Sequence, residues 1–221
     1  IIFIISKKKK LIKKYFYNDQ FFKKIIKKKK DKRIKREYKK ILKYRKFIKF
    51  VYQNHPRGTG DAVLKAKKIV KDKYFLMLLP DDLIIKNNCS KEMINIHKNK
   101  KCSVMASLKV PKKNVSRWGI YSVNAKISDS NFIIKDVVEK PDIKNAPSNL
   151  AVIGRYILPF KIFDKLKNQK KGKGGEIHIT DSIRRIIKEG ELFIGHNLKG
   201  KYLDCGTMNG YINSSLEIFK I

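Results

Sequence analysis

The sequence is poor in acidic residues, in cysteine and in long apolar runs. Its 221 residues include 19 Asp and Glu against 54 Lys and Arg, which gives a net charge of +35. Three cysteines, Cys89, Cys102 and Cys205, are too few and too widely spaced for a disulfide scaffold, and they favour reduced thiols in a cytoplasmic protein. No run approaches the roughly 18 apolar residues of a membrane-spanning helix, so we expect none.

The positive charge is uneven along the chain. Residues 1–50 hold 22 Lys and Arg and 3 acids, a net charge of +19, with basic runs at 7–10 and 27–30. Non-specific binding to polyanions needs only such charge. Specific nucleic-acid recognition is disfavoured, because Lys greatly outnumbers Arg, the residue that makes bidentate contacts, and because no zinc-finger or aromatic RNA-binding motif is present.

Apolar runs and helical spacings alternate, which predicts an α/β fold with a largely parallel sheet. Buried strands are expected at 1–5 and 74–79, and the Lys-rich segment 7–47 is predicted to form two or three helices. Further strands are expected at 48–52, 103–109, 119–123, 132–138, 150–158 and 192–198, and helices at 61–70, 89–100, 159–166 and 207–219. One more helix is expected to be capped by Thr180 or Asp181.

Two motifs that flank predicted strands suit phosphate and metal binding. Gly58 and Gly60 form a Gly-rich turn before a helix, where backbone N–H groups can approach a ligand closely. By itself that turn is weak evidence, because such turns are common. Asp81 and Asp82 follow the strand at 74–79, where a carboxylate is well placed to hold Mg²⁺ beside a phosphate. The alternative for these acids is a loop or a helix cap.

Two more motifs carry little weight when each is taken alone. Glu139 and Lys140 stand at a predicted strand end before Pro141, where they could bind a sugar hydroxyl and a phosphate. Asp204, two residues before Gly206, could supply a second metal ligand.

Taken in order, these blocks resemble bacterial UTP–glucose-1-phosphate uridylyltransferases. The similar blocks are RGTGDAV (57–63), LLPDDLI (78–84), VSRWGI (115–120), VVEKP (137–141), APSNLAVIGRYIL (146–158), GKGGEIHITDSI (172–183) and YLDCGTMNGY (202–211). The resemblance covers roughly residues 1–5 and 48–221. It implies a single Rossmann-like nucleotidyltransferase domain over 1–221, with a mixed, mostly parallel sheet flanked by helices and the segment 7–47 within it.

The resemblance also implies a reaction, in which UTP and glucose 1-phosphate give UDP-glucose and pyrophosphate with Mg²⁺ as cofactor. Lys140 and Asp81 would be the catalytic residues. The implied ligand contacts are Gln53 and Gly58 for uracil, Asp81 and Asp204 for Mg²⁺, Lys140 for the phosphates, and Gly119, Glu139 and Glu176 for the glucose hydroxyls. The alternative for Glu176 is that it only orders its turn. A homo-oligomer is also implied.

The sequence departs from this family in two places. It lacks the family's opening strand and GxGTR loop, so we expect an N-terminally truncated domain of low stability with little or no turnover by itself. Thr59 and Asp61 stand where this branch usually has Leu and His, and an Asp near a triphosphate needs a metal or a Lys to compensate it. A related enzyme for dTTP or another sugar 1-phosphate stays an alternative, as does an inactive remnant that acts as a basic polyanion-binding module.

Overall fold

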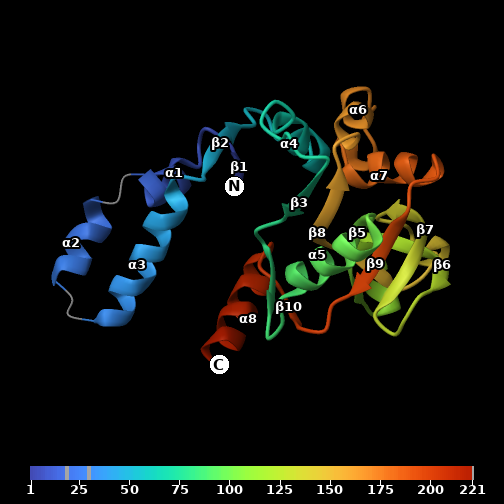
Figure 1. The fold of residues 1–221 in the computed structure, drawn as a ribbon. Coiled ribbons are helices and arrows are strands. Elements are labelled where there is room, and N and C mark those ends of the chain that lie inside the picture. Colours follow the sequence, from blue (N-terminus) through green and yellow to red (C-terminus); the bar gives the residue numbers. More distant parts are fainter. Residues whose placement is uncertain (18–19, 29–30, 221) are drawn as a thin grey trace.

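The computed structural model describes residues 1–17, 20–28 and 31–220 (Figure 1). Within these ranges no helix is long and apolar enough to cross a membrane. The largest sheet has six strands in the order β3-β8-β5-β9-β7-β6. In that order the strands are Tyr74–Leu78, Leu150–Pro159, Ser103–Lys109, Phe193–Asn197, Asn131–Glu139 and Gly119–Lys126.

Most neighbouring strands of this sheet run antiparallel, which corrects the expectation of a mostly parallel sheet. Among its described pairings only β5 and β9 are parallel, whereas β8 is antiparallel to β3, β5 and β6, and β7 is antiparallel to β6 and β9. The reason lies in the connections, because β6, β7 and β8 follow one another without an intervening α-helix, and parallel neighbours need a longer crossover. The mixed α/β class itself is confirmed.

Helices cover both faces of the large sheet. One face carries α4 (Thr59–Lys65), α6 (Ile162–Lys167) and α7 (Ile179–Lys188), and the other carries α5 (Cys89–Lys100). Side chains alternate between the two faces along a strand. In β5, Met105 packs with the α6 and α7 layer, whereas Val104 and Ala106 pack with α5. The core therefore consists of two apolar layers separated by the sheet.

Helix α7 shows how the sequence forms one of these layers. Three buried isoleucines recur at helical spacing along it: Ile179, Ile183 and Ile186. The helix begins at Ile179 with His178 as its N-cap, so the expected cap at Thr180 or Asp181 is wrong. Thr180 lies inside the first turn and is buried. Its hydroxyl does not cap the helix and can form a hydrogen bond elsewhere.

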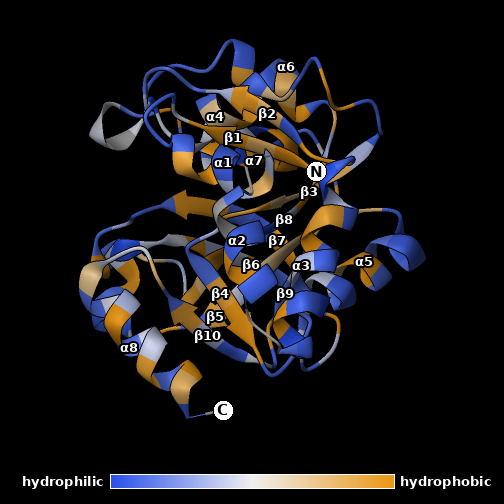
Figure 2. Cartoon of the chain, turned by 90° about the vertical axis from the view of Figure 1, so that its left-hand side faces the viewer, coloured by the Kyte–Doolittle hydropathy of each residue, from blue (hydrophilic) through white to orange (hydrophobic). Residues whose placement is uncertain are grey.

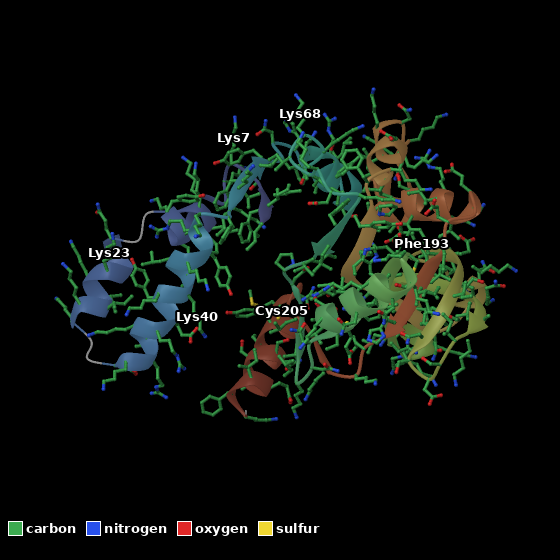
Figure 3. All side chains as sticks on the ribbon, in the orientation of Figure 1. Lys7, Lys23, Lys40, Lys68, Phe193 and Cys205 are labelled. Carbon is green, nitrogen blue, oxygen red and sulfur yellow. The ribbon has the colours of Figure 1, made fainter. Side chains whose placement is uncertain are left out.

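Along the chain, the described residues between the paired parallel strands β1 (Ile2–Ile5) and β2 (Lys49–Tyr52) form an arm of three helices, which confirms the prediction of two or three helices for segment 7–47. The helices are α1 (Lys10–Tyr17), α2 (Gln20–Lys28) and α3 (Lys32–Arg45). The arm extends away from the large sheet (Figure 1) and carries many hydrophilic stretches (Figure 2). Phe16 anchors its base, with its ring centroid 5.2 Å from that of Phe3. Lys23 and Lys40 lie on the arm, far from Phe193 in the sheet (Figure 3).

Strand β3 is an edge strand in the described structure, although its apolar sequence predicts a buried one. It pairs with β8 alone and Leu78 is 50% exposed. Within the described ranges, no strand pairing joins β1 or β2 to the large sheet. Instead, Ile2 and Ile4 pack against the core layer that contains α4.

Two strands that sequence periodicity does not indicate form the remaining sheet. They are β4 (Asp82–Ile85) and β10 (Lys201–Asp204), which pair antiparallel, and helix α8 (Met208–Phe219) follows. Short 3-10 turns occur at Lys112–Arg117, Ile143–Asn145 and Lys173–Gly175. The other predicted strands and helices are confirmed to within a few residues, except that α4 ends at Lys65 rather than near residue 70.

A buried polar contact fastens α5 to the sheet. His196 on β9 is 3% exposed, with Nε2 2.9 Å from Glu92 Oε2 and Nδ1 2.8 Å from Asn131 Oδ1. Asn87 donates to the other Glu92 oxygen at 3.2 Å. Burial opposes ionisation of Glu92, but the hydrogen bonds from His196 and Asn87 outweigh it, so the pKa of Glu92 lies below its ordinary value of 4.5.

We predict that Glu92→Gln lowers the free energy of unfolding by about 1–2 kcal/mol at neutral pH, because a charged partner of a buried histidine becomes a neutral amide. A carboxyl whose pKa is lowered by folding stabilises the fold above its ordinary pKa and loses that effect as the pH falls through the folded value. In urea unfolding, the difference in the free energy of unfolding between wild type and variant should therefore shrink as the pH is lowered below about 4. A gap that stays constant with pH would contradict this account.

Candidate functional site

A cavity of about 490 Å³ opens where β3, β7 and β10 end, and its volume falls within the roughly 300–1,000 Å³ of small-molecule sites. Five of the chain's 19 acids border it: Asp81, Asp82, Glu139, Glu176 and Asp204. Arg117 and Lys140 border it too. In a chain of net charge +35, such a concentration of carboxylates is not expected from composition alone. It favours a role for these acids in binding a ligand.

The pairing of β4 with β10 brings the aspartates together. Asp82 is directly opposite Asp204 in this ladder, and the N–H of Cys205 donates to the carbonyl of Asp81 at 2.8 Å. A Cβ added at Gly206 would lie 2.9 Å from Asp81 Oδ2 and 3.2 Å from Asp204 Oδ1. Two carboxylates from distant parts of the sequence thus converge on one point that Gly206 leaves open.

This donor set fits a magnesium ion. Mg²⁺ typically uses one or two protein carboxylates and completes its shell with water and phosphate oxygens. Asp81 and Asp204 would supply those carboxylates. In the described part of the chain, no group of three or more His, Cys, Asp and Glu is arranged to hold a metal. The two aspartates therefore suit a metal ion whose remaining ligands are water molecules and phosphate oxygens of a bound substrate.

Asp82 has a supporting role beside this point. Its Oδ2 accepts from the N–H of Gly154 at 2.6 Å, and its Oδ1 accepts from the hydroxyl of Tyr202 at 2.5 Å. Burial raises the pKa of Asp82, and the hydrogen bonds from Tyr202 and Gly154 act against that rise. Burial and the contact with Asp82 also raise the pKa of Tyr202. Asp82 therefore ties β4 to β8 and β10, and this fixes the neighbouring Asp81.

Arg117 and Trp118 form one rim of the cavity. The guanidinium of Arg117 lies 4.8 Å from the centroid of the Trp118 ring and donates to Asp204 Oδ2 at 3.2 Å. The N–H of Gly206 donates to Asp204 Oδ1 at 2.9 Å. These two donors reduce the repulsion between Asp204 and the other acids of the cavity.

Gly119 and Glu139 meet on another wall, because the antiparallel pairing of β6 with β7 places them opposite each other. A Cβ at Gly119 would lie 3.2 Å from Glu139 Oε2, so a larger residue at this position would crowd the carboxylate. The next residue, Lys140, has φ 45° and donates its N–H to the carbonyl of Trp118 at 3.0 Å. This turn keeps the lysine beside the same cavity as Glu139.

The Gly-rich turn packs against residues 176–178. The N–H of Gly60 donates to the carbonyl of Ile177 at 2.7 Å, and the N–H of Ile177 donates to the carbonyl of Arg57 at 2.8 Å. Gly58 has φ 108°, and a Cβ there would lie 2.6 Å from the Ile177 carbonyl oxygen. Of this turn, Thr59 borders the cavity.

Gln53 is held by the first turn of α4. Its Nε2 donates to Asp61 Oδ2 at 2.8 Å and to the carbonyl of Gly58 at 3.3 Å. Asp61 is buried, and Lys65 Nζ lies 3.2 Å from its Oδ1. Lys65 is therefore one of the two compensating partners, a metal or a lysine, that the sequence calls for beside Asp61.

The structure brings six of the eight predicted site residues to one cavity: Asp81, Gly119, Glu139, Lys140, Glu176 and Asp204. Gln53 and Gly58 do not border it, so their contact with uracil stays a prediction. The side chain of Glu176 is exposed, and its backbone carbonyl accepts from Gly172 at 2.7 Å. Glu176 thus borders the cavity while its backbone closes the turn, and both interpretations of its side chain stay predictions.

Sequence reasoning missed several residues of the cavity wall: Arg117, His178, Thr180 and Tyr202. Tyr202 carried a usable signal, because it precedes Asp204 by two residues and so shares its strand face. Thr180 carried a misleading one, because threonine near a helix start suggests a cap. Trp118 and Tyr156 also border the cavity.

Comparison with known proteins defines the class to which this fold and cavity belong. Residues 8–220 match the family model described as nucleotidyl transferase. The chain belongs to the nucleotidyl transferase family, which confirms the family implied by the sequence blocks.

Within this family the chain is similar to proteins named UTP–glucose-1-phosphate uridylyltransferase. It is 37% identical to UTP–glucose-1-phosphate uridylyltransferase 2 of Streptococcus pyogenes. The similarity extends over 175 residues, which are 77% of this chain and 58% of that relative. The Pseudomonas aeruginosa relative is 36% identical over 169 residues, 75% of this chain and 60% of its own length. The chain thus spans less than two thirds of these curated relatives.

Solved structures agree with this placement. The chain is similar to a UDP-glucose pyrophosphorylase complexed with UDP-glucose, with a TM-score of 0.83 and 31% identity over 99% of this chain and 81% of that one. For an apo UDP-glucose pyrophosphorylase the TM-score is 0.88 and the identity 32%, over 99% and 80% of the two chains. The nucleotidyltransferase fold is therefore confirmed.

We predict that Gly58→Ala lowers the free energy of unfolding by more than Gly190→Ala does. Both glycines have positive φ, which strains an alanine, and Gly58, with ψ 172°, lies in a backbone region that is essentially restricted to glycine. A Cβ at Gly190 meets no atom within 4 Å, whereas at Gly58 it meets the Ile177 backbone. Urea unfolding of both variants measures the difference, and equal losses would contradict the packing of the turn on residues 176–178.

Proposed function

We propose that the chain carries the site for uridylyl transfer from UTP to glucose 1-phosphate, giving UDP-glucose and pyrophosphate. The observation that carries the proposal is a single cavity that joins converging Asp81 and Asp204 to Lys140 and to a separate carboxylate, Glu139. The relatives' names support this nucleotide and this sugar over dTTP or another sugar 1-phosphate.

The reaction forms a bond between the phosphate oxygen of glucose 1-phosphate and the α-phosphorus of UTP, and pyrophosphate leaves. Both substrates are anions, so the site must hold negative groups close together. Lys140 would contact the phosphates and stabilise their charge. Asp81 and Asp204 would hold Mg²⁺, which when bound neutralises phosphate charge. The remaining contribution of the protein is to position the two substrates.

The sugar would be bound by one wall of the cavity, and the base by Gln53, which does not border the cavity. Glu139 is an acceptor for glucose hydroxyls, and Gly119 leaves space beside it. Glu176 is a further candidate for the sugar. Gln53 uses its Nε2 on Asp61 and Gly58, so the atom it can offer to a base is its carbonyl oxygen, which suits the N3–H of uracil.

Asp81→Asn tests the proposal. We predict that it raises the dissociation constant of UDP-glucose with Mg²⁺ by about tenfold or more, because a carboxylate ligand of the metal becomes a neutral amide. Any pyrophosphate release from UTP and glucose 1-phosphate should fall with it. The circular dichroism spectrum should stay unchanged.

Asp129→Asn is the matched control, since Asp129 pairs with Lys126 in an exposed loop outside the cavity. It should bind UDP-glucose as the wild type does. Unchanged affinity in Asp81→Asn would contradict the proposed site and favour an inactive remnant that binds polyanions.

We also propose weak polyanion binding by the arm, which its charge alone supports. Replacing Lys24, Lys27, Lys35 and Lys39 by Gln should weaken binding to single-stranded RNA and flatten its salt dependence. Replacing the exposed Lys98, Lys113, Lys144 and Lys188 of the body by Gln is the control and should do so less. Equal effects of the two sets in a fluorescence titration would show that net charge, and not the arm, is responsible.

The following expectations also stay predictions. They are a homo-oligomer, a cytoplasmic location, and the treatment of residues 1–221 as one partial domain with the segment 7–47 inside it.

A further inference from the structure

We propose that Thr180 is a positioning residue that holds the Glu139 carboxylate for recognition of sugar hydroxyls. Thr180 is 4% exposed and lies in the first turn of α7. Its Oγ1 donates to Glu139 Oε2 at 2.7 Å. The inference rests on the proposed function, which supplies a nucleotide sugar as the ligand.

The Glu139 carboxylate needs such a partner, because the terminal torsion of a glutamate is broad and the carboxylate otherwise rotates. The hydrogen bond from Thr180 fixes one oxygen, Oε2. The second oxygen, Oε1, lies 3.8 Å from His178 Nδ1, a distance that allows an ion pair with a protonated imidazole but exceeds the usual length of a hydrogen bond. Oε1 is therefore the atom that the fixed carboxylate offers to a sugar hydroxyl.

Thr180 itself is held firmly enough to do this. The N–H of Ile179 donates to the hydroxyl of Thr59 at 3.2 Å, and Gln169 Nε2 donates to the carbonyl of His178 at 2.8 Å. These contacts fasten the start of α7. Threonine is also β-branched, which restricts its own side-chain torsion.

The same contacts give the wall its shape. A Cβ at Gly119 would lie 3.3 Å from Thr180 Cγ2 and 3.2 Å from Glu139 Oε2. Gly119, Glu139 and Thr180 thus border one small space from β6, β7 and α7. Thr180 acts on a sugar in that space through Glu139, which sets it apart from a ligand-contacting residue.

Titration calorimetry of UDP-glucose and of UDP, each with Mg²⁺, tests the inference. For wild type we expect tighter binding of UDP-glucose than of UDP. Thr180→Val removes the hydroxyl at nearly constant volume, and it should weaken UDP-glucose binding by about 5–20-fold while UDP binding stays within about twofold. Thr180→Ser keeps the hydroxyl and should restore the preference for UDP-glucose.

A double-mutant cycle with Glu139→Gln adds a readout that a merely structural threonine would not move. If Thr180 acts through Glu139, Thr180→Val should have little further effect on UDP-glucose affinity in the Glu139→Gln background. Additive losses would overturn the inference. Should Thr180→Val fail to fold, as judged by circular dichroism, Thr180→Ala removes the hydroxyl without placing a methyl group against Glu139.

The remaining outcomes separate this inference from the proposed function. Unchanged UDP-glucose affinity in Thr180→Val and Thr180→Ala, or equal losses for UDP and UDP-glucose in these variants, would overturn the positioning role and leave the proposed function standing. Wild-type chain that binds neither ligand with Mg²⁺ would overturn both.

Discussion

The site depends on the antiparallel pairing of β4 with β10. Tyr202 and Asp82, 120 residues apart, are hydrogen-bonded across it, and Asp82 stands opposite Asp204. Like charges placed directly opposite destabilise a sheet. Here Tyr202 and Gly154 donate to Asp82, and Arg117 donates to Asp204. The ladder can therefore place Asp81 beside Asp204 at the cavity, where both carboxylates meet.

The electrostatics of the cavity differ from those of the chain around it. The protein carries a net charge of +35, yet its cavity holds five acids beside Arg117 and Lys140. Phosphate groups are repelled by carboxylates unless a cation lies between them. Under the proposed function, the acids would therefore make nucleotide binding depend on a divalent cation. The excess positive charge is concentrated in and around the arm, on the far side of β1 and β2 from the large sheet (Figure 1).

Much of the site could be predicted from sequence where a functional residue ends a recognisable strand. Asp81 and Glu139 each follow an apolar run, and both border the cavity. Strands β4 and β10 could not be predicted, because four residues are too few for periodicity and their pairing partner is distant. The prediction of a mostly parallel sheet was wrong because apolar runs carry no information about the connections between strands. Gln53 was predicted from resemblance alone, and the structure shows its amide engaged with Asp61.

The most direct test of this account is the position of UDP-glucose in a crystal structure of the chain with Mg²⁺. We predict that the glucose ring lies beside Gly119 and Glu139, the diphosphate beside Lys140, and the metal between Asp81 and Asp204. A ligand bound outside the cavity, or a metal held by other groups, would contradict it.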